Sequence, residues 1–166
     1  MPEKKTLERA REDAREGKAP STQAREFVRE EIDHVRGGKH GARSAKQAIA
    51  IGLSKARRAG VKLAPPKKGK ASEKTRKQAA RTYARGQKSP AAAASPTRSR
   101  ATKSALQREG KQAASKSALS RQAHASARSR GAANRSLAAK KAVRTKGAVG
   151  LRTAARKAAR TRARGR

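Results

Sequence analysis

The chain has 166 residues, and its 46 Lys and Arg outnumber its 11 Asp and Glu so strongly that the net charge is +35. A charge of this size indicates a polyanionic partner and is unusual for a metabolic enzyme. The absence of cysteine excludes disulfides and thiolate zinc sites, and no run approaches the roughly 18 apolar residues of a membrane span. We expect a cytoplasmic protein that needs no cofactor.

The large apolar residues are concentrated near the start of the chain. Ten of them lie in residues 1–63, and only seven lie in the other 103 residues. Residues 1–36 carry nine acids and nine bases, so the whole net charge arises from residues 37–166. We therefore predict an all-α fold, with a small N-terminal domain of two or three helices over 1–63 and a long disordered, conditionally helical basic tail.

Three helices are predicted in the N-terminal domain, over 6–16, 22–36 and 44–59. The third is the best defined, because Ser44 and Gln47 have capping-box spacing and Gly60 supplies a left-handed end. The second and third helices should form a hairpin that buries Phe27, Ile32, Val35, Ile49 and Leu53. Glu31 lies within this apolar stripe, either at its edge or paired with a base from the next helix.

A basic linker rich in Pro, Ser and Ala is predicted over 64–100. Pro65-Pro66 ends the domain, because proline cannot continue a helix and the lysines that follow cannot pack in a core. The linker contains a possible helix at 72–85, with Gly86 as its stop, and the chain breaks again at 89–96.

The Ala/Lys/Arg-rich tail over 101–166 holds a nine-residue basic unit twice, at 138–146 and 154–162. Drawn as helices, the first unit places its alanines on one side and Lys140, Lys141 and Arg144 on the other, and the second unit repeats this division. Each unit could therefore lay a basic face along a row of phosphates. Short units of like charge lose to repulsion and to the cost of helix nucleation, so we expect them to become helical only on binding.

The loop at 37–43 allows two interpretations. Its free backbone N–H groups and nearby bases could cradle a phosphate at the start of the next helix, or it could be an ordinary hairpin turn. His34 and His40 match no zinc or metalloprotease spacing, so we predict that both are exposed and that no metal binds. The serines have no accompanying base or acid of a catalytic site, so we do not expect an enzyme.

The segment from Ser44 to Gly60 resembles the core of a family of small basic bacterial proteins of unknown function. In that family a Gly/Lys-rich loop precedes a Ser-x-Lys-Gln-Ala-Ile-Ala-Ile-Gly-Leu-Ser-x-Ala-Arg core, and the likeness covers about residues 20–63. It implies no activity and no site residue. The tail resembles the C-terminal domains of linker histones and bacterial histone-like proteins through its Ala-Ala-Lys-Lys-Ala units, which implies DNA condensation.

We expect the chain to be a histone-like, nucleoid-associated protein that binds and compacts duplex DNA without sequence specificity. One Phe, one Tyr and no Trp leave it without the aromatic surfaces on which single-strand binders stack bases. Structured RNA remains open as a partner, as in an RNA- or ribosome-associated protein. A third interpretation is an interaction module that its tail tethers to nucleic acid. A homo-oligomer could form through the N-terminal helices, and no membrane partner is expected.

The candidate nucleic-acid-binding residues are lysines and arginines in three places. The first is the loop and third helix of the N-terminal domain, the second is a Ser-Pro-x-basic turn that could enter a narrow minor groove, and the third is the pair of basic units. These residues are Lys39, Arg43, Lys46, Lys55, Arg57, Arg58, Arg98, Arg100, Lys140, Lys141, Arg144, Arg156, Lys157 and Arg160.

Overall fold

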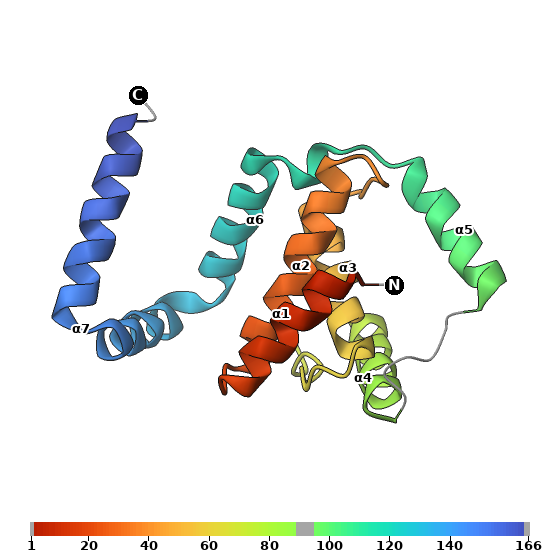
Figure 1. The fold of residues 1–166 in the computed structure, drawn as a ribbon, viewed down its shortest axis with the longest axis horizontal. Helices are drawn as coiled ribbons and strands as arrows, with labels where there is room; N and C mark the ends of the chain where they lie inside the picture. The colour runs from red at the N-terminus through yellow and green to blue at the C-terminus, as the bar shows by residue number, and fades with distance from the viewer. Residues whose placement is uncertain (1, 89–94, 165–166) are drawn as a thin grey trace. The chain divides into compact units, whose positions relative to one another are not determined.

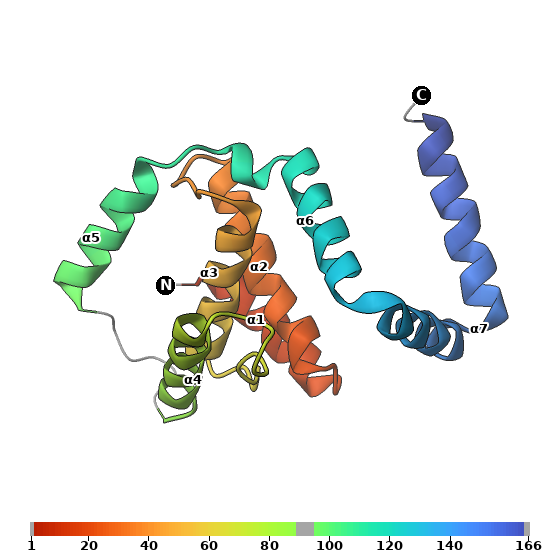
Figure 2. The same ribbon diagram turned by 180° about the vertical axis from the view of Figure 1, so that it is seen from behind.

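A computed structural model describes residues 2–88 and 95–164 (Figures 1 and 2). Over these ranges the chain is helical and has no β-strand, which confirms the predicted all-α class. The chain divides into two compact units, Met1–Ser120 and Arg121–Arg166, which are described separately. None of the described helices is long and apolar enough to cross a membrane.

Three helices form the centre of the first unit, and each begins and ends within two residues of its predicted bounds. They are α1 (Lys4–Arg15), α2 (Pro20–Arg36) and α3 (Ala45–Arg58). The Ser44 hydroxyl accepts a hydrogen bond from the Gln47 backbone N–H at 3.2 Å, as predicted. The Gln47 side chain accepts instead from the Arg43 N–H at 2.8 Å, one residue before the partner that a capping box requires. At the other end Gly60 has φ +91° and Val61 packs in the core, so the predicted helix end is confirmed.

Both α1 and α3 pack against α2, and two small apolar clusters result. The first contains Ala10, Ala24, Phe27, Ala56 and Val61, and the second contains Val35, Ala42, Ala48, Ala113 and Ala114. Phe27 and Val35 are fully buried, as predicted, whereas Ile32, Ile49 and Leu53 remain partly exposed. The interior is built mostly from alanines, because α2 and α3 approach too closely to hold larger side chains between them.

The predicted linker contains a helix that is part of the first unit. Helix α4 (Glu73–Lys88) packs on α3 and buries Ala79 and Thr82. The predicted stop at Gly86 is wrong, because the helix runs through this residue. A Cβ at Gly86 would overlap the Arg57 carbonyl oxygen, so the glycine serves the close approach of α4 to the end of α3.

The tail is predicted to be disordered, whereas the structure describes most of it as helical. Three helices and a short 3₁₀ turn cover most of it: α5 (Pro96–Gln107), η1 (Gln112–Ala114), α6 (Lys116–Ser129) and α7 (Gly131–Arg164). Alanine, lysine and arginine are strong helix formers, and this local preference is satisfied even where little apolar surface is buried. The turn η1 packs on α2 and α3 and buries Ala113 and Ala114, so the first unit extends beyond residue 63.

Two parts of the predicted linker and tail, residues 89–94 and 165–166, lie outside the described residues. The predicted chain break at 89–96 therefore falls mostly outside them.

Helix α7 is bent at Gly147, where φ is +63° and ψ is 176° (Figure 1). This backbone conformation is essentially restricted to glycine. The two basic units fall on opposite sides of the bend, since the first ends directly before Gly147 and the second begins seven residues after it. Each unit is therefore contained in one straight half of α7.

Candidate nucleic-acid interface

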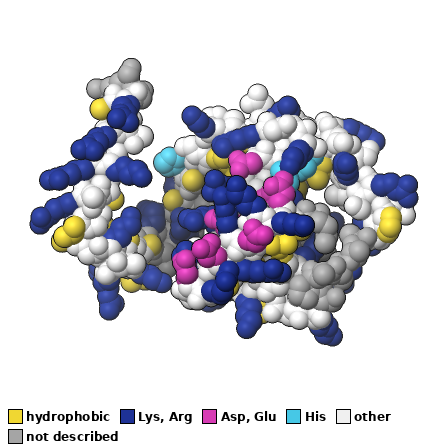
Figure 3. Space-filling view, in the orientation of Figure 1, with side chains coloured by type: hydrophobic (Ala, Val, Ile, Leu, Met, Phe, Trp, Pro, Cys, Tyr) yellow, Lys and Arg dark blue, Asp and Glu magenta, His cyan; other side chains and the backbone are white. Residues whose placement is uncertain are grey.

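The second unit presents basic side chains without any acidic partner. Its described residues include fourteen Lys and Arg, and every one of them is exposed. The sequence has no Asp or Glu after Glu109, so no carboxylate within this unit can neutralise them. In Figure 3 the acidic side chains gather over α1 and α2, whereas Lys and Arg project from α7 with no acid among them.

The two basic units of α7 have the same local structure. The Thr145 hydroxyl donates to the Lys141 carbonyl at 2.9 Å, and the Thr161 hydroxyl donates to the Lys157 carbonyl at 3.0 Å. At 3.6 residues per turn, three of the four bases of each unit share one side of its helix and the alanines share the other, with Lys146 and Arg162 on the alanine side. The candidate residues that form the two basic faces are Lys140, Lys141 and Arg144 in the first unit, and Arg156, Lys157 and Arg160 in the second.

The candidate bases at 98 and 100 lie in a helix and not in the predicted turn. Pro96 occupies the first position of α5, where its fixed φ suits a helix start. Arg98 and Arg100 are therefore in the first turns of α5, and both are exposed. On α3, Lys46 and Arg58 are exposed as well.

The remaining four candidate bases have partners inside the first unit. Lys39 Nζ lies 2.7 Å from Glu3 Oε1, and Arg43 lies 3.3 Å from Glu109 Oε1. Lys55 Nζ lies 2.6 Å from a carboxylate oxygen of the fully buried Glu31. The second of the two interpretations of Glu31, pairing with a base of the next helix, is therefore the one that the structure shows.

Arg57 is the most buried of the candidate bases. Its guanidinium donates to the carbonyls of Leu63 at 3.1 Å and Ala64 at 3.4 Å, and burial lowers its pKa. These bonds fasten the chain that leaves α3 to the body of that helix. Arg57 and Lys55 thus serve the packing of the hairpin, and neither presents a free charge to a ligand.

The loop at 37–43 cannot act as the phosphate cradle that was one of its two interpretations. Six of its backbone N–H groups already donate within the protein. Gly37, Gly38, Lys39, Gly41, Ala42 and Arg43 donate to Asp33, Val35, His34, Leu106, Gly110 and Gln47, respectively. The loop is a hairpin turn that also holds the end of α5 and the residues that follow it, through the carbonyls of Leu106 and Gly110.

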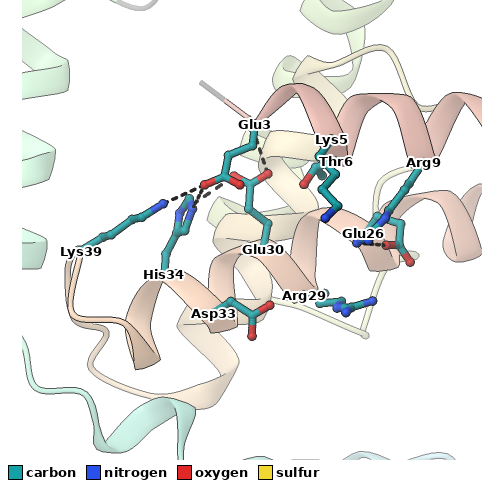
Figure 4. Close-up of a pocket in the computed structure, with 10 residues that line it drawn as sticks. All are labelled: Glu3, Lys5, Thr6, Arg9, Glu26, Arg29, Glu30, Asp33, His34 and Lys39. Carbon is teal, nitrogen blue, oxygen red and sulfur yellow. Dashed lines mark hydrogen bonds and ion pairs between the residues drawn. The ribbon is translucent and has the colours of Figure 1, made fainter.

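A charged cluster surrounds Glu3 at the start of α1 (Figure 4). It borders a cavity of about 340 Å³ between α1 and α2. Lys39 and His34 both point at the Glu3 carboxylate, and their hydrogen bonds, with Lys39 the larger cause, lower the Glu3 pKa to about 2. Because both acids and bases line this cavity, it does not form a patch of one sign.

The sequence did not reveal how closely two histidines approach a buried carboxylate. The His34 and His40 side chains are only 14% and 15% exposed, so the prediction that both are exposed is wrong. One ligand atom from each of Glu31, His34 and His40 lies within 4.8 Å of the other two. Two features of the sequence could have indicated this cluster. Glu31 and His34 are three residues apart, which places both on one face of α2, and the tight turn after α2 brings His40 back to that face.

The comparisons with known proteins are consistent with the resemblance found in the sequence. A family model described as "Family of unknown function (DUF6496)" matches residues 15–68. This match covers about a third of the chain and includes all of α2 and α3. Neither a curated protein nor a solved structure matches the chain. The hairpin of α2 and α3 is thus similar to a family to which no function has been given.

Proposed function

We propose that the protein binds duplex DNA through the phosphate backbone, without reading its sequence, and compacts it as a histone-like, nucleoid-associated protein. The observation that carries this proposal is the second unit, in which fourteen described bases are exposed and no acid is present. Helix formation places these bases in rows, and a row of cations on a helix can contact a row of phosphates. Release of condensed counterions from the duplex then supplies the free energy of binding.

The dimensions of the basic units suit a duplex. Nine helical residues span about 13 Å at 1.5 Å per residue. Over that length B-DNA carries about eight phosphates, at one charge per 1.7 Å of helix axis. Each unit therefore meets more phosphates than it has bases, and neither unit saturates the segment that it covers. Compaction follows because duplex segments whose phosphates are partly neutralised repel one another less.

A duplex is favoured over single strands because the chain offers no stacking surface. Phe27 is fully buried in the first apolar cluster, and Tyr83 is half-buried on α4. The chain has no other aromatic residue apart from its three histidines. Proteins that bind single strands or read RNA sequence stack bases on exposed aromatic rings. The lysine and arginine side chains of this protein therefore recognise the phosphate backbone of the nucleic acid.

The salt dependence of binding tests the mechanism. If about fifteen phosphates are neutralised, the slope of log K against log salt is about −13. Replacing Lys140, Lys141, Arg144, Arg156, Lys157 and Arg160 with Gln in the full-length chain should make the slope shallower by about 5, since each lost contact removes roughly 0.9. The matched control exchanges Lys and Arg at the same six positions and should keep the original slope.

A wild-type slope shallower than about −4 would contradict binding driven by the tail. Competition decides between the two kinds of nucleic acid. We expect plasmid DNA to displace a labelled duplex at least as well as ribosomal RNA does at equal phosphate concentration. A clear preference for ribosomal RNA would show that structured RNA is the partner.

A further inference from the structure

Two histidines and a buried carboxylate converge where α2 turns toward α3. Glu31 and His34 stand one helical turn apart on α2, and His40 belongs to the loop that leads into α3. Glu31 Oε1 and His40 Nε2 are 3.4 Å apart. His34 belongs to the same cluster, in which one ligand atom of each of the three side chains lies within 4.8 Å of the other two.

The hydrogen bonds of His40 determine which of its nitrogens faces Glu31. Nδ1 lies 3.0 Å from the Gly41 carbonyl oxygen, and because a carbonyl can only accept, Nδ1 is the protonated nitrogen. In the neutral ring Nε2 then carries a lone pair, which points at another acceptor, the Glu31 carboxylate. Two acceptors at this distance repel each other unless a positive species lies between them. The backbone bond to Nδ1 is also the usual support of a histidine that ligates a metal through its other nitrogen.

Glu31 has one oxygen available for such a species. Its side chain is fully buried, and Lys55 Nζ lies 2.6 Å from Oε2. Among the described residues, no donor forms a hydrogen bond with either oxygen of Glu31, and the ion pair with Lys55 is made by Oε2. Leaving a buried carboxylate oxygen without a donor is costly, so Oε1 needs a partner.

The charge around Glu31 favours a cation. Three carboxylates, of Glu3, Glu30 and Glu31, are joined by two ammonium groups, of Lys39 and Lys55. One negative charge therefore remains when both histidines are neutral. This excess is found in a chain whose net charge is +35, so it is a local property of the cluster.

We propose that Glu31, His34 and His40 bind one divalent metal ion of the zinc class. Zinc accepts two histidine nitrogens and a carboxylate oxygen, with bonds of about 2.0–2.1 Å and a solvent ligand in the fourth position. In a tetrahedron with such bonds, two ligand atoms lie about 3.3 Å apart. Glu31 Oε1 and His40 Nε2 already have this separation. A shift of the His34 ring toward them completes the set.

The metal would join the end of α2 to the loop that enters α3. This loop also donates from Gly41 and Ala42 to the carbonyls of Leu106 and Gly110. Holding His40 in place therefore also supports the segment that carries η1. Because a metal that binds only the folded state stabilises that state, zinc should raise the melting temperature of the first unit.

The test uses the full-length protein after treatment with EDTA and removal of the chelator. We expect Zn²⁺ to bind with one equivalent in calorimetry and to raise the melting temperature followed by circular dichroism. Either His34→Gln or His40→Gln should weaken this binding at least tenfold. His124→Gln is the matched control, because His124 is the third histidine of the chain and is exposed on α6, and it should bind Zn²⁺ as the wild type does.

A measurement on the wild type keeps the test valid if a variant fails to fold. One equivalent of Zn²⁺ should shift the ring signals of two of the three histidines in NMR spectra, and the signal that is lost in His124→Gln should be the one that does not shift. The proposal is overturned if no stoichiometric binding occurs, if His40→Gln binds Zn²⁺ as tightly as the wild type, or if the His124 ring is the one that responds.

Discussion

Lys55 and Lys46 lie nine residues apart on α3 and have different surroundings. Lys46 is exposed, whereas the Lys55 side chain is 22% exposed and reaches the buried carboxylates of Glu30 and Glu31. Removing one partner of a buried ion pair leaves the other charge without compensation, and this costs more than the pair contributes. Lys55 is therefore a residue of the interior, although its sequence context resembles that of the surface bases around it.

Replacing Lys55 with Gln should lower the free energy of unfolding by about 2 to 3 kcal/mol, somewhat less than the roughly 3 to 5 kcal/mol for fully buried pairs, because the ammonium group is partly exposed. Lys46→Gln removes the same charge from the same helix and should change stability by less than about 0.5 kcal/mol. Urea unfolding in the presence of EDTA measures both. Equal effects of the two substitutions would show that the buried pairing is unimportant.

Glu73 offers a pH-dependent contact at the start of α4. The guanidinium of Arg76 donates to its carboxylate at 2.7 and 3.0 Å, and this holds the Glu73 pKa below its ordinary value of 4.5. A carboxyl with a lowered pKa stabilises the fold above its unfolded-state pKa, and the contribution is lost as the pH falls through the folded-state value. An NMR titration should therefore place the Glu73 midpoint below 4.5, and Arg76→Gln should raise it. A midpoint that does not move would show that the ion pair is absent in solution.

At the scale of the helices, the contact between α2 and α3 depends on Gly52. A Cβ at this position would lie 2.6 Å from the Val28 Cα and 3.0 Å from the Phe27 carbonyl oxygen. Replacing glycine with alanine inside a helix ordinarily stabilises it by about 1 kcal/mol. Here the added methyl group would force the two helices apart.

We expect Gly52→Ala to destabilise the first unit by about 1 to 3 kcal/mol, the cost of overpacking a core. Gly110→Ala is the control, because a Cβ there would meet nothing within 4 Å, and its effect on stability should be small. Thermal unfolding followed by circular dichroism measures both. Stabilisation by Gly52→Ala would contradict the close approach of the helices.

The bend in α7 is testable because the chain has no native cysteine. Spin labels attached to cysteines at Ala138 and Ala158 would lie about 30 Å apart on a straight helix. In the wild-type background the separation should be shorter. Gly147→Ala should lengthen it, since alanine avoids this backbone conformation. A control pair at Asn134 and Thr145 lies before the bend and should keep its separation, and an unchanged distance between the first pair would contradict the role of the glycine.

The sequence predicted elements well where two local signals coincided. In α1, α2 and α3 the spacing of apolar residues agreed with proline, serine or glycine at the ends. It failed for η1, whose contribution to the core is two alanines that look like any others in the tail. Disorder was predicted for the tail because net charge and hydropathy describe the ability to bury a core, whereas helix formation in α7 depends on the backbone preference of each residue.

The candidate site was predicted only in part, for a related reason. A base in a sequence reveals its charge but not its partner. Lys39, Arg43, Lys55 and Arg57 have partners that come from distant residues or from the chain that leaves α3, and these partners depend on packing. The exposure of the bases of α7 could be predicted because the sequence around them contains no acid with which they could pair.

For the whole molecule, the apolar core lies in the first compact unit, and the second unit carries fifteen bases without an acid. Both apolar clusters consist of residues before residue 120, so they lose no member when residues 121–166 are removed. A fragment of residues 1–120 should therefore unfold at a temperature within a few degrees of that of the full-length chain. It should also elute from a duplex DNA column at lower salt than the full-length chain, because its net charge falls from +35 to +20 and the fifteen bases that have no acid among them are gone. Undiminished retention would place the nucleic-acid contact in the first unit.

The spacing of the two basic units gives Gly147 a geometric consequence. The units are sixteen residues apart, and on a continuous α-helix sixteen residues make four full turns and a further rotation of roughly 160°. Two basic faces in such a helix would be nearly back to back, so a single duplex could meet only one of them. Gly147 lies outside the helical conformation, so it changes the rotation between the two halves of α7. The direction of the second basic face is then set by the backbone angles of Gly147 as well as by the number of residues between the units. If α7 binds DNA as we propose, Gly147 determines whether its two basic faces contact the same duplex or two separate duplexes.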